Sequence, residues 1–428
     1  MPRQRTSAHA SKRGVVGVVL AGGGARGAYE LGALSVLLPV LEQRGESPRI
    51  FVGTSVGAIN AASLAATSHL PAQEAIVGEL ARWHEVDRGA VISPILPRLP
   101  LTAIRFAGEL LSLPGVRVAS LLDPSPLERN LRRWIDWPQL HRNLAGTSTC
   151  RLAVIATAAR TGRAVAFVEG DTHEAITTSH VIDYVPASLD ETHVRASAAI
   201  PILFPPVRVE DPPEARGWYI DGATRLNTPI KPALDLGAER LVVIGTGSVI
   251  PAPKNPGRHD APAPDLGSSA LHLLQGALAD PLVEDLRKLA DINTFYTDKG
   301  SSPAAARHRQ AHGKPPYRQI PYMFIAPRTP SAIAKLATDV FHSRYGGLKA
   351  LRSPDLAVLS RLLGGQSHTH GELLSYLLFD HEFISALIEM GAQDATAWLN
   401  MSPGIDEPWQ VDPLDALNDS GRPAKAND

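Results

Sequence analysis

Ser55 lies in the pentapeptide Gly-Thr-Ser-Val-Gly at 53–57, which has the form G-x-S-x-G. The pentapeptide follows an apolar segment at 49–53 that predicts a strand, and it precedes a stretch that predicts a helix. Glycines two positions before and after a serine permit the tight turn that projects its hydroxyl group outward, as in a nucleophile elbow. Ser55 is therefore a candidate nucleophile, with Gly53 and Gly57 as the glycines of its turn.

A second glycine segment, Gly-Gly-Gly-Ala-Arg-Gly at 22–27, joins a predicted strand at 15–21 to a predicted helix at 28–41. Glycines let backbone N–H groups approach a negatively charged group, and the positive end of the following helix adds to the attraction. The segment matches the dinucleotide fingerprint G-x-G-x-x-G, but no acidic residue ends the next predicted strand, as that fingerprint requires. A P-loop is disfavoured because no Lys-Ser or Lys-Thr follows. The stabilisation of an oxyanion fits better, since both glycine segments fall at the C-terminal edge of neighbouring parallel strands.

A nucleophilic serine needs a base. The chain has 15 histidines, so their number does not exclude a Ser-His-Asp triad, yet none follows a late strand. Asp221 is another candidate, because the apolar strand predicted at 218–220 delivers it to a turn at Gly222, although Asp-Gly pairs also occur in plain turns. The histidines closest to a pattern are expected at the surface: His308, His312, His368 and His370.

In this order, the glycine segment at 22–27, the pentapeptide at 53–57 and Asp-Gly-Ala at 221–223 resemble the three motifs of the patatin-like phospholipase family. The segment at 196–206 resembles another block of that family, and the likeness covers about residues 15–247. The third motif has Asp-Gly-Ala in place of Asp-Gly-Gly, a variant that the family tolerates. Beyond residue 265 the likeness is loose, so the role of that region is unassigned.

The resemblance implies a serine hydrolase with a dyad, in which Ser55 is the nucleophile and Asp221 the proton acceptor. It implies no metal and no organic cofactor. Arg26 would orient the glycine segment or contact a substrate phosphate, and a structural salt bridge is the alternative. The oxyanion hole implied by the resemblance consists of Gly22, Gly23, Gly24, Arg26 and Gly27.

The implied substrate is a lipid acyl ester, either a phospholipid or a lysophospholipid. A triacylglycerol lipase or a soluble carboxylesterase with the same dyad is an alternative. A second alternative is a catalytically latent lipid-binding regulatory protein, and a third is a nucleotide-binding protein that uses the glycine segment.

Short runs rich in Val and Ile alternate with longer helical patterns, which predicts an α/β fold whose central, mostly parallel sheet is flanked by helices. A mainly helical C-terminal extension is expected, with helical patterns over 268–292 and 372–389. The predicted strands are 15–21, 49–53, 151–157, 163–168, 218–220, 240–245 and 322–326.

The predicted organisation divides the chain into a flexible N-terminus (1–13), a catalytic domain (14–250), a linker (251–266), a mainly helical region (267–400) and a flexible tail (401–428). Within the catalytic domain, the segment 88–126 is an insertion rich in proline and leucine. It could cover the active site as a lid or dock on a lipid surface, or simply pack on the core. The segment 300–319 is expected to be a basic loop.

The amino-acid composition limits the classes of partner and the cell compartment that we expect for this chain. The chain has 42 Lys and Arg against 43 Asp and Glu, a formal charge of −1, so nothing favours nucleic acid as a partner. A single cysteine, Cys150, cannot form an intramolecular disulfide, which mildly favours the cytoplasm. The basic start resembles a signal peptide, but its apolar run ends at once in the glycine segment, and no run is long enough to span a membrane. We therefore expect at most peripheral membrane contact, and the oligomeric state stays open.

Overall fold

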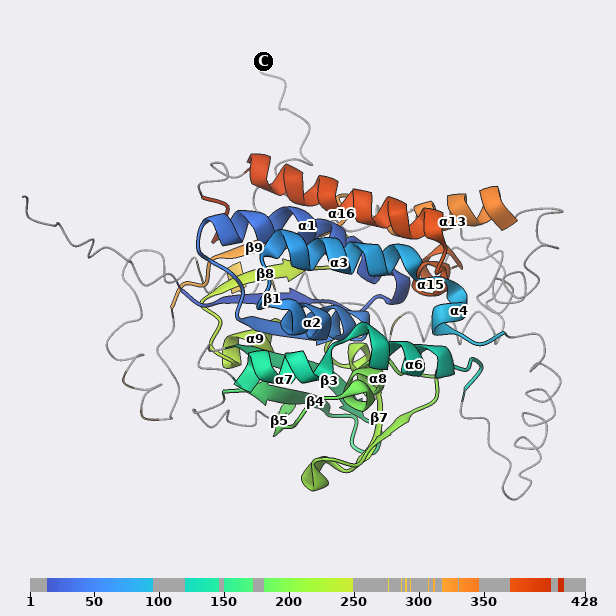
Figure 1. Cartoon of the computed structure of the whole chain (residues 1–428), viewed down its shortest axis with the longest axis horizontal. Helices are drawn as coiled ribbons and strands as arrows, with labels where there is room; N and C mark the ends of the chain where they lie inside the picture. The colour runs from blue at the N-terminus through green and yellow to red at the C-terminus, as the bar shows by residue number, and fades with distance from the viewer. Residues whose placement is uncertain are drawn as a thin grey trace, which may run out of the picture.

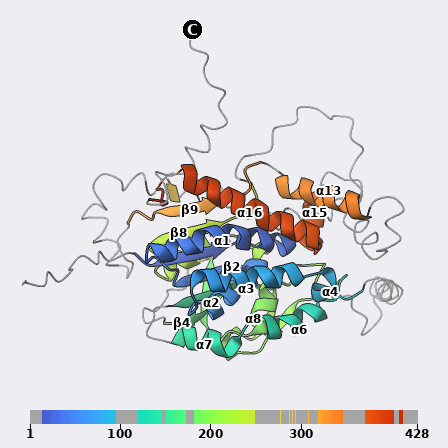
Figure 2. The same ribbon diagram turned by 45° about the horizontal axis from the view of Figure 1, so that its top comes forward.

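The computed structural model describes residues 14–94, 120–145, 150–171, 181–248, 318–329, 331–345, 370–401 and 407–411, with a few single positions between 276 and 311. A central sheet is flanked by helices, as Figures 1 and 2 show. This architecture confirms the predicted fold class, including the helical C-terminal part. The described helices are α1 (Gly27–Gln43), α2 (Val56–Thr67), α3 (Ala72–Glu85), α4 (Arg88–Val91), α6 (Ser125–Trp134), α7 (Trp137–Ala145), α8 (Glu191–Ser197), α9 (Ile230–Asp235), α13 (Ala332–Tyr345), α15 (His370–Leu377) and α16 (His381–Met401).

The strand order along the sheet is β5-β4-β3-β2-β1-β8-β9, and β6 and β7 branch from it. Neighbours along this order run parallel except β3 and β4. Strands β6 and β7 form an antiparallel pair, and β7 also runs antiparallel to the end of β3. The bounds are β1 (Val16–Leu20), β2 (Ile50–Thr54), β3 (Arg151–Ala158), β4 (Ala164–Gly170), β5 (Ile182–Pro186), β6 (Val207–Val209), β7 (Gly217–Asp221), β8 (Arg240–Ile244) and β9 (Tyr322–Ile325).

All seven predicted strands are present, with ends within two residues of the prediction. Strands β5 and β6 were not predicted. Strand β5 lies at the edge of the sheet and alternates between buried and partly exposed residues, and β6 has only three residues, of which Arg208 is exposed. Neither presents the continuous apolar run by which fully buried strands are found in a sequence.

Strand β3 brings the ends of β2 and β7 together. Thr54, the last residue of β2, pairs with Ile155, and Asp221, the last residue of β7, pairs with the next residue, Ala156. Strand β4 pairs with the other edge of β3, so β2 and the antiparallel β7 meet end to end along the same edge. The residue that follows β2 and the last residue of β7 therefore lie side by side.

The predicted helix at 372–389 is wrong as a single element, because α15 ends at Leu377 and α16 begins at His381. Asp380 explains the break. Its carboxylate accepts hydrogen bonds from the N–H groups of Glu382 (2.9 Å) and Phe383 (3.4 Å), which are unpaired at the start of a helix. The apolar spacing continues across the break because residues on both helices are buried in the same core.

Helices α1 and α16 lie side by side and touch through glycines (Figure 2). A Cβ atom on Gly32 would come within 2.0 Å of the Ile388 carbonyl oxygen, and one on Gly391 within 2.1 Å of the Tyr29 carbonyl oxygen. The Tyr29 hydroxyl also donates a hydrogen bond of 2.8 Å to Asp394. The C-terminal helices are therefore packed directly on the first helix of the sheet domain.

Residues 407–411, which the prediction places in the flexible tail, contact the sheet domain. The backbone of Gln410 exchanges two hydrogen bonds with that of Tyr322, at 2.8 and 3.0 Å. The Trp409 indole donates a hydrogen bond of 3.0 Å to Glu46. Asn293, one of the single positions described, is buried and hydrogen bonded to the Ile320 carbonyl.

Several predictions about the chain's organisation lie outside the described residues. They concern the N-terminus at 1–13, the linker at 251–266, nearly all of 268–292 and of the basic loop, and the tail beyond 411. Of the predicted insertion at 88–126, only the two ends are described. Ser93 and Asp123 hold these ends together through hydrogen bonds of 2.9 Å. In the described part of the chain, no helix has the length and apolarity that crossing a membrane requires.

Substituting Gly32 by alanine tests the contact between α1 and α16. We expect Gly32→Ala to lower the free energy of unfolding by about 1–3 kcal/mol, because the added methyl group overlaps a backbone carbonyl. Gly78 is the matched control, since it is an exposed helical glycine with nothing within 4 Å of its Cβ position. There, alanine should stabilise by up to about 1 kcal/mol. Urea denaturation measures both, and equal effects would contradict the close contact.

Candidate active site

The Ser55 hydroxyl donates a hydrogen bond of 2.7 Å to the carboxylate of Asp221. Both residues are buried. Ser55 has φ 55° and ψ −123°, a strained backbone conformation for a residue other than glycine. Its turn is compact, because a Cβ on Gly53 would lie 2.1 Å from the Gly57 carbonyl oxygen. The structure thus brings together the predicted nucleophile and base, and gives the pentapeptide the geometry of a nucleophile elbow.

Ser197, at the end of α8, supports this strained turn. Its hydroxyl accepts a hydrogen bond of 2.8 Å from the Ser55 N–H and donates one to the Ile155 carbonyl. Ser197 is fully buried. It belongs to the block at 196–206 that resembles the family, but no sequence pattern indicated that its side chain would hold the Ser55 backbone.

Asp221 lies in a site that favours its neutral form. Burial raises the pKa of its carboxyl group to about 7, although hydrogen bonds from the Ser55 hydroxyl and the Ala223 N–H lower it. The bond from Ala223 is 2.8 Å long. A carboxylate with a pKa near neutrality is a stronger base than an exposed one, and it can take the proton of a serine that attacks a carbonyl carbon. Such a raised pKa beside a pocket is typical of a functional site.

None of the four histidines that are expected at the surface has a described side chain. His308, His312 and His368 lie outside the described residues, as does the side chain of His370. Among the described residues, no group of three or more His, Cys, Asp or Glu could hold a metal ion.

The N–H groups of the glycine segment divide into two sets. The Gly22 N–H donates to the side chain of Asn227 at 3.0 Å, and the Gly27 N–H donates back to the carbonyls of its own turn. The N–H groups of Gly23 and Gly24 donate to no described residue. Of the predicted oxyanion residues, these two retain a donor for a ligand, whereas Gly22 and Gly27 provide close packing.

Gly24 has φ 57°, a conformation that favours glycine. A Cβ there would also lie only 2.2 Å from the Tyr376 carbonyl oxygen, which belongs to α15. A Cβ on Gly22 would overlap the Asn227 side chain at 2.5 Å and approach that of Ser55 at 3.2 Å. Glycine is therefore required at both positions by the close approach of other chain segments.

Arg26 contributes a structural anchor rather than a hydrogen-bond donor to the pocket. Its guanidinium donates to the Ser375 hydroxyl at 2.8 Å and to the backbone carbonyl of Glu372 at 3.0 Å, and it forms an ion pair with the Glu372 carboxylate. It also lies 4.4 Å from the centre of the Tyr376 ring. Of the alternatives left open by the sequence, the structure supports the salt bridge that fixes the loop.

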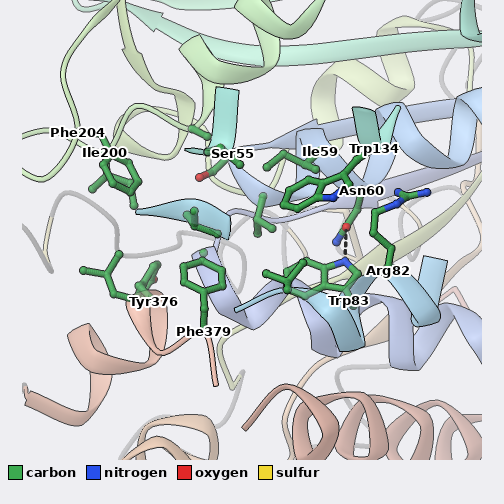
Figure 3. A pocket seen from close by; sticks show the side chains of 17 residues that line it. Ser55, Ile59, Asn60, Arg82, Trp83, Trp134, Ile200, Phe204, Tyr376 and Phe379 are labelled. Atoms are coloured by element: carbon green, nitrogen blue, oxygen red, sulfur yellow. Dashed lines mark hydrogen bonds between the residues drawn. The ribbon is translucent and has the colours of Figure 1, made fainter. Parts of the chain in front are cut away.

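A pocket of about 650 Å³, including the part open to solvent, lies beside Ser55 (Figure 3). Its walls are mainly apolar and come from α2, α3, α6, α15 and the segment that follows α8. The labelled residues with aromatic side chains are Trp83, Trp134, Phe204, Tyr376 and Phe379.

The sequence did not identify these pocket residues. Trp83 is on α3, Trp134 on α6 and Tyr376 on α15, and no motif links these three segments. Most apolar residues of α15 and α16 are buried in the core, yet Tyr376 and Phe379 face the pocket. One signal was present in the predicted insertion, because Val91 from its first end lines the pocket, as does Leu127, the residue that follows its second end.

Comparison with known proteins gives two findings. Residues 18–234 match the model of a family described as patatin-like phospholipase. Among solved structures, the crystal structure of VipD from Legionella pneumophila is similar, with 16% sequence identity and a TM-score of 0.31. That similarity covers 73% of this chain and 61% of the VipD chain, so this chain spans less than two thirds of that one. A search of curated proteins found no match.

Replacing Asp221 by asparagine should stabilise the protein at neutral pH. The raised pKa means that the folded state holds the Asp221 proton more tightly than the unfolded state. The stabilisation that this proton gives to the folded state is fully present below pH about 3.8 and is lost as the pH rises through about 7. Asparagine can keep hydrogen bonds to Ser55 and Ala223 without a charge. The free energy of unfolding of Asp221→Asn, relative to wild type, should therefore rise between these pH values, by on the order of 4 kcal/mol.

Urea denaturation of both proteins at a series of pH values measures this difference. Asp339→Asn is the control, because Asp339 is exposed on α13. A difference that does not change with pH for Asp221→Asn would mean that the carboxyl group titrates normally in the folded protein.

Proposed function

The chain belongs to the patatin-like phospholipase family of lipid acyl hydrolases, and from this premise we propose that it is a serine hydrolase that releases fatty acids from lipid acyl esters through Ser55 and Asp221. The observation that carries the proposal is the buried hydrogen bond of 2.7 Å between the strained serine and a carboxylate whose pKa is raised to about 7. The apolar pocket beside that serine supports a substrate with a hydrocarbon chain.

In the first step, the Ser55 oxygen attacks the ester carbonyl carbon as its proton passes to Asp221. The tetrahedral intermediate then collapses, the bond to the leaving alcohol breaks, and the alcohol takes the proton from Asp221. In the second step, Asp221 accepts a proton from water as the water attacks the acyl-serine ester. Collapse of this second intermediate releases the fatty acid and returns the proton to Ser55.

The negative charge that develops on the carbonyl oxygen would be held by the N–H groups of Gly23 and Gly24. They suit this role because they donate to no described residue and belong to the loop that packs on the Ser55 turn. Each donor of this kind typically lowers the barrier by about 3–4 kcal/mol. Arg26 would act indirectly, because its bonds to α15 hold the loop in place.

Labelling with a fluorophosphonate probe tests the nucleophile. We expect an adduct on Ser55, located by mass spectrometry, and none in Ser55→Ala. Release of fatty acid from lysophospholipid micelles and phosphatidylcholine vesicles should be lost in Ser55→Ala. It should fall by a factor of about 100–10,000 in Asp221→Asn, because the general base is removed.

Asp339→Asn should keep wild-type activity, and circular dichroism should show that each variant is folded. Activity that persists in Asp221→Asn but disappears on substitution of one histidine would contradict the dyad. The absence of both labelling and fatty acid release in wild type would contradict the proposed enzyme.

The pH dependence of kcat/KM tests the base independently. Asp221 must be ionised to accept the serine proton, and burial raises its pKa to about 7. We expect kcat/KM to increase about tenfold per pH unit below pH about 7 and to level off above it. A plateau that already begins near pH 5 would mean that the catalytic base has an ordinary carboxyl pKa.

A further inference from the structure

One end of the pocket is not accounted for by the chemistry at Ser55. Figure 3 shows Trp83 and Trp134 at this end, Ile200 and Phe204 at the other, and Ser55 between them. We call the first the tryptophan end of the pocket. A chain bound to the Ser55 oxygen and directed this way would meet an indole ring as the boundary of its site.

Trp83 is held in place by buried hydrogen bonds. Its indole N–H donates to the side-chain oxygen of Asn60 at 3.1 Å, the bond drawn in Figure 3. The Asn60 amide nitrogen donates in turn to the Gly27 carbonyl at 3.1 Å and to the Glu30 carboxyl group at 2.8 Å. Asn60 and Glu30 are buried, and Trp83 is 7% exposed. Moving the indole would break a buried chain of bonds, which makes it a rigid wall.

The same indole is also fixed by packing. A Cβ on Gly27 would lie 3.0 Å from the Trp83 ring and 2.4 Å from the Val56 side chain. Gly27 therefore lets the ring pack against the start of α1, directly beside the residue that follows Ser55. The wall and the reacting group thus belong to one tightly packed unit.

The tryptophan end suits hydrocarbon and not a polar head group. Ile59 on α2, another wall residue labelled at this end in Figure 3, is apolar. The one charged wall residue, among those described, is Arg82. Its guanidinium is bound to Glu79 at 2.8 and 3.1 Å and to the Ser63 hydroxyl. These bonds neutralise the guanidinium and hold it on the side of Arg82 that points away from Ser55, as Figure 3 shows.

We propose that Trp83, held by Asn60, limits the length of the acyl chain that the enzyme accepts. This inference rests on the proposed function and specifies its substrate further. A chain that ends before the indole fills the pocket, whereas each further methylene group must displace a ring that is bonded and packed. One methylene group too many in an apolar pocket typically changes kcat/KM by a factor of about 10–200.

The test measures kcat/KM for p-nitrophenyl esters of saturated fatty acids, from butanoate to hexadecanoate, with the full-length protein. For wild type we expect kcat/KM to fall steeply above a limiting chain length. In Trp83→Ala that limit should move to longer chains. The ratio of kcat/KM for the first rejected ester to that for the best wild-type ester should rise about tenfold or more. Trp83→Phe removes less volume, so a smaller shift in the same direction is expected.

Trp218→Ala is the matched control, because Trp218 is 55% exposed on β7 and does not line the pocket. It should keep the wild-type chain-length profile. Ratios measured on one preparation do not depend on the folded fraction, and Trp83→Phe serves if Trp83→Ala does not fold. An unchanged profile in the Trp83 variants, or no decline in wild type, would overturn the inference while leaving the hydrolase intact. If wild type hydrolyses none of the esters, or if Ser55→Ala hydrolyses them as fast as wild type does, the proposed function would instead be refuted.

Discussion

The buried hydrogen bond between Ser55 and Asp221 is the interaction on which the arrangement of this molecule depends. Burying a carboxyl group is costly, and the cost appears as its raised pKa. The sheet places a hydrogen-bond donor beside the buried carboxyl group, because β2 and β7 end against each other along one edge of β3. Ser197 and the turn glycines hold the serine in a conformation it would not adopt alone. The burial of apolar side chains in the sheet core stabilises the fold and so offsets the strain at Ser55.

The site extends beyond the segment that matches the family, which ends at residue 234. Helix α15 presses on the glycine loop at Gly24 and binds Arg26, and its Tyr376 lines the pocket. Helix α16 fixes the neighbouring part of the chain by packing on α1. The loop that follows β1 is thus shaped by residues about 350 positions later in the sequence. The C-terminal helices are therefore parts of the candidate active site, not an appendage to it.

The sequence predicted what local patterns encode. Strands β1, β2 and β8 are continuous apolar runs because both of their faces are buried, and the motifs around Ser55 and Asp221 identified the pair that the structure brings together. It could not predict contacts that depend on the tertiary arrangement. Ser197, Trp83 and Tyr376 carry no motif, and which glycine N–H groups are already bonded follows from the position of Asn227. The break at Asp380 was missed because apolar spacing persists across it, although an aspartate before a helix is a recognisable capping signal.

The contact between Arg26 and α15 also bears on how the protein is made. A ribosome delivers the chain from its N-terminus, and early segments begin to fold while later ones are still being synthesised. Ser55 and Asp221 can meet once β7 has emerged, but the glycine loop acquires its anchor only when residues 372–376 follow. Until then, the nascent chain lacks the helix that holds the glycine loop in place. A product truncated before α15 would contain Ser55 without the helix that orders the loop beside it.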